Sequence, residues 1–286
     1  MDAFPQLKAT SPNTLAKRLL VAFVLLPLGL AVIVIGGAVY AGFVALLLGL
    51  AAWEYSNLFH AGGLRPAGVL LVSGALLLVV ERALTGLENV GWLLVLLIFG
   101  AMAFHLLDYE RGRGQPGTDF SITIAGLLYI GWLGAYLISL RFLPDGKWWV
   151  LLALPTVWIA DSAAFVFGTR FGRHKMSPRL SPKKTWEGYL GGLGSAIVGG
   201  ALLALVIRDG TGLVALFTLA RGALLGLVIG ALTPLGDLGE SMIKRQVGAK
   251  DSGNLLPGHG GIFDRIDSWL WAAPISYYLI VWFFLS

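Results

Sequence analysis

The chain contains no cysteine and few charged residues. Of its 286 residues, 13% are Asp, Glu, Lys or Arg, whereas soluble domains carry about 25% charged residues. Without cysteine there can be no disulfide, thiolate nucleophile or thiolate-bound metal. The low charge comes with 57% hydrophobic residues and a mean hydropathy of +0.78, which excludes an ordinary soluble globular protein.

Long hydrophobic runs predict an all-α, polytopic integral membrane protein with about nine transmembrane helices, since a bilayer-spanning helix takes roughly 17–25 residues. The predicted spans are 19–37, 39–53, 67–82, 90–107, 121–140, 148–168, 188–207, 213–235 and 268–285. The first run follows basic residues but is long and lacks a clear cleavage site, so it predicts a membrane helix rather than a secretory signal. The eighth contains Arg221, and a charge at mid-bilayer costs about 2.5–3.5 kcal/mol. Either that span begins after Arg221, or the arginine faces protein or water.

The basic residues predict the orientation. With a cytoplasmic N-terminus, the cytoplasmic segments hold 16 of the 21 basic residues: Lys8, Lys17, Arg18, Arg65, Arg111, Arg113, Arg170, Arg173, Lys175, Arg179, Lys183, Lys184, Lys244, Arg245, Lys250 and Arg265. The other side holds Arg82, Arg141, Lys147, Arg208 and Arg221. This asymmetry follows the positive-inside rule and fits a bacterial inner membrane with the polar loops facing the cytoplasm, with an organellar membrane as the alternative. It also explains the net charge of +5, so we expect no nucleic-acid partner.

The chain divides into residues 1–145, predicted to be N-terminal membrane helices, and residues 146–286, which hold both polar clusters described below. No internal repeat is evident, which weakens a transporter built from inverted halves. Glycines recur inside the predicted spans, and we expect them to allow close helix packing.

The first polar cluster runs from Asp161 to Glu187. Asp161 lies in or beside an apolar span, where an ionisable residue indicates function by default, although a capped structural Asp is the alternative. The basic residues after it could simply bind anionic lipid headgroups. Ser181-Pro182-Lys183-Lys184-Thr185, however, places hydroxyl and ammonium groups just before a predicted helix. That arrangement suits a phosphate chain, bound through point charges and backbone N–H groups.

The second polar cluster runs from Pro234 to Asp267. A helix over 237–247 places Asp237, Glu240, Ser241 and Lys244 on one face. Lys250 and Asp251, a loop rich in glycine and proline, and Asp264-Arg265-Ile266-Asp267 follow. Carboxylates with few histidines suit Mg²⁺, which binds a few carboxylates together with substrate phosphates. His259, in the loop, could be a general acid, a phosphate donor or a plain loop residue, and we favour the phosphate donor.

These residues resemble the phosphatidate cytidylyltransferase (CDP-diacylglycerol synthase) family. The matching positions are Ser241, Lys244, Arg245, Lys250, Asp251, Gly253, Pro257, His259, Gly260, Gly261, Asp264, Arg265 and Asp267. Asp161 and the stretch 181–188 also resemble the family, so the motif match covers about residues 158–270, and the N-terminal half is similar only in hydropathy. Family members usually have Thr-Gly or Thr-Ala after this aspartate, whereas Ser162-Ala163 follows here and keeps the hydroxyl.

The resemblance implies transfer of the cytidylyl group of CTP to phosphatidic acid, giving CDP-diacylglycerol and pyrophosphate. It implies a cytoplasm-facing site, a homodimer among membrane lipids, and Mg²⁺, with or without a second cation, on Asp237 and Asp264. Asp161, Ser181, Lys183, Lys184 and Ser241 would bind CTP. The catalytic set would be Lys244, Arg245, Lys250, Asp251, His259, Arg265 and Asp267.

Two other functions fit parts of the sequence. A CTP-dependent kinase of lipid alcohols would transfer the γ-phosphate and release CDP, and charge patterning alone does not exclude it. A transporter or channel would place its charged groups at mid-span along a path, whereas most charges here are predicted in loops or at one membrane face.

Overall fold

A computed structural model describes residues 23, 26–86, 90–255 and 260–286. Almost all regular structure in these residues is helical, which confirms the all-α prediction. The elements are α2 (Gly37–Ala61), α3 (Gly68–Thr85), α4 (Val90–Glu110), α5 (Pro116–Gly126), a π-helical turn η1 (Leu127–Trp132), α6 (Tyr136–Phe142), α7 (Gly146–Phe171), β1 (Lys175–Ser177), β2 (Ser181–Thr185), α8 (Trp186–Thr211), α9 (Leu219–Leu232), α10 (Pro234–Gln246) and α11 (Phe263–Phe283).

Within the described residues, seven helical stretches are long and apolar enough to cross a membrane. They are Gly37–Ala61, Gly68–Thr85, Val90–Glu110, Pro116–Phe142, Gly146–Phe171, Trp186–Thr211 and Leu219–Gln246. A shorter apolar helix, Leu26–Ile35, overlaps the first predicted span, part of which lies outside the described residues. The helix α11 overlaps the ninth. The polytopic membrane class is thus confirmed, while the count of nine and the cytoplasmic N-terminus stay predictions.

The eighth span was predicted to start too early. Gly212, with a φ of 76°, ends α8 in the left-handed region, and α9 begins only at Leu219 with Thr218 as its cap. Arg221 therefore lies in the first turn of α9. Its Nη1 donates to the carbonyl oxygens of Ala215 (2.7 Å) and Leu216 (3.3 Å). Of the two alternatives for this arginine, the structure selects the one in which it faces protein.

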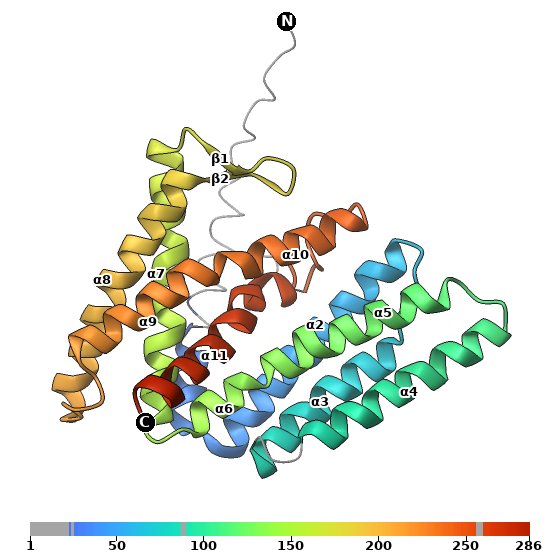
Figure 1. Cartoon of the computed structure of the whole chain (residues 1–286), viewed down its shortest axis with the longest axis horizontal. Helices are drawn as coiled ribbons and strands as arrows, with labels where there is room; N and C mark the ends of the chain where they lie inside the picture. The colour runs from blue at the N-terminus through green and yellow to red at the C-terminus, as the bar shows by residue number, and fades with distance from the viewer. Residues whose placement is uncertain (1–22, 24–25, 87–89, 256–259) are drawn as a thin grey trace, which may run out of the picture.

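The helices form two groups joined by α10 and α11 (Figure 1). The helices α2 to α6 pack together, while α7 and α9 lie against α8. The last helix, α11, contacts α2 and α6 of the first group and α7 and α9 of the second. The hairpin β1–β2 and the far end of α10 project at the same end of the molecule in Figure 1.

Glycines allow α8 and α9 to approach closely. A Cβ at Gly200 would lie 2.5 Å from the carbonyl oxygen of Gly222 and 3.3 Å from Cα of Gly226. No larger side chain fits there, so the expectation that such glycines serve helix packing is confirmed at this position.

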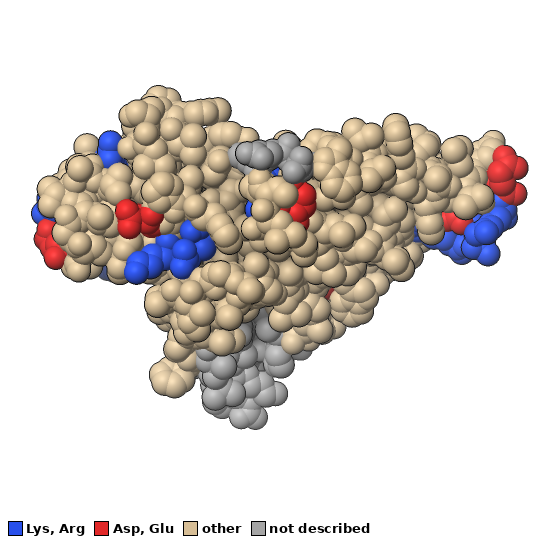
Figure 2. Space-filling view, turned by 90° about the horizontal axis from the view of Figure 1, so that it is seen from below, with Lys and Arg blue, Asp and Glu red and all other residues tan. Residues whose placement is uncertain are grey.

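The surface suits lipid rather than water. Large apolar side chains such as Val69, Leu84 and Phe165 are at least 70% exposed. Most of the face in Figure 2 carries neither acidic nor basic side chains. Exposed apolar area on this scale is what a membrane-embedded protein presents to acyl chains.

Candidate active site

The polar helix α10 continues directly from the apolar helix α9. Pro234 occupies the first position of α10, where its missing N–H leaves no helical bond unmade. The predicted polar face of this helix is present. Ser241 Oγ lies 3.4 Å from Asp237 Oδ1, and Lys244 Nζ lies 2.7 Å from Glu240 Oε2.

Lys244 is buried between two carboxylates. Besides Glu240, its ammonium group contacts Asp264 Oδ1 at 2.6 Å. The other oxygen of Asp264, Oδ2, accepts hydrogen bonds from the backbone N–H groups of Ser252 and Gly261, both at 2.8 Å. Ser252 Oγ lies 2.9 Å from the same oxygen. Lys244 and the loop donors therefore hold Asp264 in one orientation.

These surroundings keep Asp264 ionised. Burial by itself would raise the pKa of this carboxyl group. The neighbouring Glu240 and Lys244 side chains and the backbone N–H groups of Gly261 and Ser252 instead lower the pKa to about 2. Hydrogen bonds to the charged form outweigh desolvation here.

The hairpin β1–β2 brings the first cluster to the second. Its strands pair antiparallel, and Thr185 caps α8 by accepting a hydrogen bond from Gly188 N at 3.1 Å, so the predicted helix start after this stretch is confirmed. Because successive side chains of a strand point to opposite faces, Lys183 and Lys184 diverge. Lys184 Nζ lies 2.7 Å from Asp237 Oδ2, whereas Lys183 is exposed.

Three aspartates from three helices influence one another electrostatically: Asp161 of α7, Asp237 of α10 and Asp267 of α11. Burial, and then the charges of Asp237 and Asp161, raise the pKa of Asp267 to about 7. Such an excess of negative charge, supplied only by oxygen atoms, suits a hard divalent cation. In the described part of the chain, no three His, Asp or Glu side chains are placed to hold one metal ion together.

The two predicted metal ligands differ in how well they fit a cation. Asp237 is half-buried, with Lys184 on Oδ2, so it can accept a metal ion at the edge of the cluster. Both oxygens of Asp264 already accept close hydrogen bonds, and a metal ion on Oδ1 would have to displace Lys244.

The remaining candidate residues are Arg245, Lys250, Asp251, Arg265, Ser181 and His259. Arg245 Nη1 donates to the carbonyl oxygen of Ala249 at 2.9 Å and so closes the end of α10. Lys250, Asp251 and Arg265 are exposed and Ser181 is half-buried. His259 lies outside the described residues.

Sequence reasoning missed Glu54 and Ser252. Glu54, on α2, accepts hydrogen bonds from Ser252 Oγ and from the first residues of α11. A carboxylate at the edge of an apolar run was the available signal, since ionisable residues within membrane helices are usually functional. The predicted span ended at residue 53, and this placed Glu54 outside the helix.

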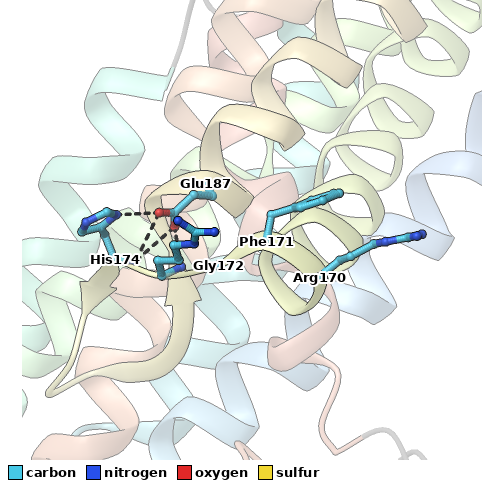
Figure 3. Close-up of a pocket in the computed structure, with 6 residues that line it drawn as sticks. Arg170, Phe171, Gly172, His174 and Glu187 are labelled. Carbon is cyan, nitrogen blue, oxygen red and sulfur yellow. Dashed lines mark hydrogen bonds and ion pairs between the residues drawn. The ribbon is translucent and has the colours of Figure 1, made fainter.

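A hollow of about 530 Å³ lies at the base of the hairpin, lined by residues 170–174 and Glu187. In Figure 3, Glu187 points toward His174, while Arg170 and Phe171 lie on the other side. Glu187 contacts His174 Nδ1 at 2.6 Å and accepts a hydrogen bond from Arg173 N at 3.0 Å. These contacts anchor the start of the hairpin to α8.

Comparison with known proteins agrees with this chemistry. Residues 16–283 match the model of the cytidylyltransferase family. A protein of Synechocystis sp. named phosphatidate cytidylyltransferase is 32% identical over 93% of this chain and 96% of its own length. Proteins of the same name from Pseudomonas aeruginosa and Staphylococcus saprophyticus are 36% and 33% identical, over 91% and 92% of this chain and 95% and 98% of their own lengths. With its oxygen-rich, lysine-paired cluster at one end of a bundle of apolar helices, the chain belongs to the cytidylyltransferase family.

Proposed function

We propose that the chain transfers the cytidylyl group of CTP to phosphatidic acid and produces CDP-diacylglycerol and pyrophosphate for phospholipid synthesis. The observation that carries this proposal is a pair of ion pairs, one between Lys184 and Asp237 and one between Lys244 and Asp264. Cationic and carboxylate groups from three separate segments thus form one polar centre, as a nucleotide triphosphate and a metal ion would require. The names of the full-length relatives supply the substrates.

In this reaction, a phosphate oxygen of phosphatidic acid attacks the α-phosphorus of CTP. A bond forms between that oxygen and the α-phosphorus, and the bond to the oxygen bridging the α- and β-phosphates breaks, releasing pyrophosphate. A phosphate monoester has a second pKa near 6, so it is mostly ionised at neutral pH and needs little help from a base. The protein's contribution is to position the substrates and to stabilise negative charge.

The lysines have different roles, since those on β2 bind substrate and the one on α10 positions acidic side chains. Lys184, Lys183 and Ser181 on β2 bind the phosphates of CTP, with Asp161 and Ser241 beside them. Lys244 holds Asp264 and Glu240 in place. In this proposal Arg245, Lys250, Arg265 and His259 would neutralise the remaining phosphate oxygens, and Asp251 and Asp267 would orient these basic groups or complete the surroundings of the metal ion.

Mg²⁺, with or without a second cation, would bind Asp237, with Asp267 and Asp161 near it. Asp264 would join this set if Lys244 moved aside. Bound there, the cation would neutralise charge on the leaving pyrophosphate.

The protein is an integral membrane protein, and we place the site on the cytoplasmic side of a bacterial inner membrane. The positive-inside count and the supply of CTP support that side. We propose that the acyl chains of phosphatidic acid stay in the bilayer while the headgroup reaches the polar centre. A homodimer is a further part of the proposal and rests on the family resemblance. The expected lack of a nucleic-acid partner rests on the distribution of the basic residues.

The deciding experiment uses purified protein in detergent with phosphatidic acid, Mg²⁺, and CTP labelled at either the α- or the γ-phosphate. We expect the α-label in the lipid product and the γ-label in pyrophosphate. Label transferred from the γ-phosphate to an added lipid alcohol would instead establish a kinase. If no acceptor is labelled by protein that binds CTP, the proposal is wrong.

A further inference from the structure

Glu54 is a buried carboxylate on an apolar helix. It lies on α2, one of the seven helices able to cross a membrane, and is 1% exposed. Burying a charged group away from water is costly unless hydrogen bonds compensate it. Its partners therefore indicate what the residue does.

Those partners belong to the other end of the chain. Glu54 Oε1 accepts a hydrogen bond from Ile262 N at 3.0 Å. Oε2 accepts one from Phe263 N at 2.9 Å. Ile262 is the N-cap of α11 and Phe263 is its first residue, and the first N–H groups of a helix have no partner within it. A side chain of α2 thus caps α11, and its negative charge suits the positive end of the helix dipole.

The loop before α11 leaves room for this contact. A Cβ at Gly253 would lie 2.8 Å from Glu54 Oε1, and a Cβ at Gly261 would collide with Glu54 Oε2. Any other residue at either position would push the carboxylate away. Both glycines belong to the stretch that resembles the family signature, so part of that signature serves contact with Glu54.

Ser252 connects Glu54 to Asp264. Its hydroxyl oxygen lies 2.9 Å from Glu54 Oε2 and 2.9 Å from Asp264 Oδ2. The backbone N–H of Ser252 also donates to Asp264 Oδ2, at 2.8 Å. Asp264 in turn contacts Lys244. A continuous chain of contacts therefore runs from α2 through the loop to the polar face of α10.

We propose that Glu54 is a positioning residue for cytidylyl transfer, which holds Ser252 and the start of α11 so that Asp264 faces Lys244. The proposal rests on the proposed function for its effect on turnover, but the contact itself can be tested separately. It assigns the N-terminal helices a direct part in shaping the catalytic loop.

The first test compares Glu54→Gln with Glu81→Gln. Glu81 is a second buried glutamate of the N-terminal helices, but its side chain bonds Thr85 within its own helix. In Glu54→Gln, an amide NH₂ replaces one acceptor and faces N–H or O–H donors. We expect kcat to fall about 10–100-fold, the loss typical of small misplacements of catalytic groups, while Glu81→Gln keeps wild-type kcat. KM for CTP should change much less than kcat, and both variants should elute as folded protein.

The second test uses Ser252. Ser252→Ala should lower kcat, Ser252→Thr should restore much of it by keeping the hydroxyl, and adding Ser252→Ala to Glu54→Gln should cost little more. Residues that act through one contact give such non-additive effects. Fully additive losses, or equal kcat in Glu54→Gln and Glu81→Gln, would overturn the proposal. Should Glu54→Gln fail to fold, the comparison of Ser252→Ala with Ser252→Thr still tests the proposal.

The third test does not depend on activity. Because the chain has no cysteine, Asn254→Cys, at an exposed loop position, gives a single site for a nitroxide spin label. We expect the label to move faster in the Glu54→Gln background than in the wild-type or Glu81→Gln background. Unchanged spectra in all three would show that Glu54 does not hold the loop, whatever reaction the protein catalyses.

Discussion

Lys184 Nζ lies 2.7 Å from Asp237 Oδ2 and joins the hairpin before α8 to the polar helix α10. Neighbouring Lys183 is exposed, and strand geometry turns it to the opposite face. Two adjacent lysines with the same charge therefore have different surroundings, so the substitution of Lys183 can serve as the control for the substitution of Lys184.

Lys184→Ala should impair CTP use more than Lys183→Ala does. We expect Lys184→Ala to lower kcat/KM for CTP at least about tenfold, since a charge-assisted phosphate contact is among the strong interactions. Its effect on thermal stability should stay below about 1 kcal/mol, because partly exposed ion pairs contribute little. Steady-state kinetics and thermal unfolding in detergent measure the two effects. A larger kinetic loss in Lys183→Ala would show that the exposed lysine makes the stronger phosphate contact.

Lys244→Met should destabilise the protein. The substitution leaves the ionised Asp264 buried without its counter-charge, and breaking a buried ion pair costs about 3–5 kcal/mol. Adding Asp264→Asn should recover part of the stability, because the buried charge is then removed, but it should not recover turnover. Thermal unfolding of the two variants measures this. Wild-type stability in Lys244→Met would contradict the buried arrangement.

Chelation of divalent metal should abolish turnover, and added Mg²⁺ should restore it. Asp237→Asn should raise the half-saturating Mg²⁺ concentration about 10–100-fold, a loss typical of disturbed metal sites. The matched control is Asp209→Asn, because Asp209 is exposed near the far end of α8 and pairs with Arg208. Equal Mg²⁺ dependence in the two variants would show that Asp237 does not bind the metal ion.

Alanine substitutions at two glycines of α8 should change the stability of the protein in opposite directions. Gly194 has open space where a Cβ would stand, so Gly194→Ala should stabilise the helix by about 0.5–1 kcal/mol. In Gly200→Ala the new methyl group would stand 2.5 Å from the carbonyl oxygen of Gly222, and such overpacking costs about 1–3 kcal/mol. Thermal unfolding in one detergent compares both variants with the wild type. The same sign for both would mean that α8 and α9 are not packed so closely.

The helices could be predicted because the signals for them are local. An apolar run long enough to cross a bilayer has few alternatives to a helix, and a period of 3.6 residues predicted the shared face of Asp237 and Lys244. The early start given to the eighth span shows where this reasoning fails. Residues 213–218 are apolar enough to continue a helix, yet the structure ends α8 at Gly212 and caps α9 with Thr218.

The partners within the site could not be predicted in the same way. The sequence determined the membrane class, the polar stretches and the acids and bases available for chemistry, because composition and periodicity are properties of nearby residues. Only the tertiary structure decided that Lys184 meets Asp237, that Lys244 lies between Glu240 and Asp264, and that Glu54 caps α11. These pairs form because helices distant in sequence pack side by side, and buried polar groups must then find partners across the packed surfaces.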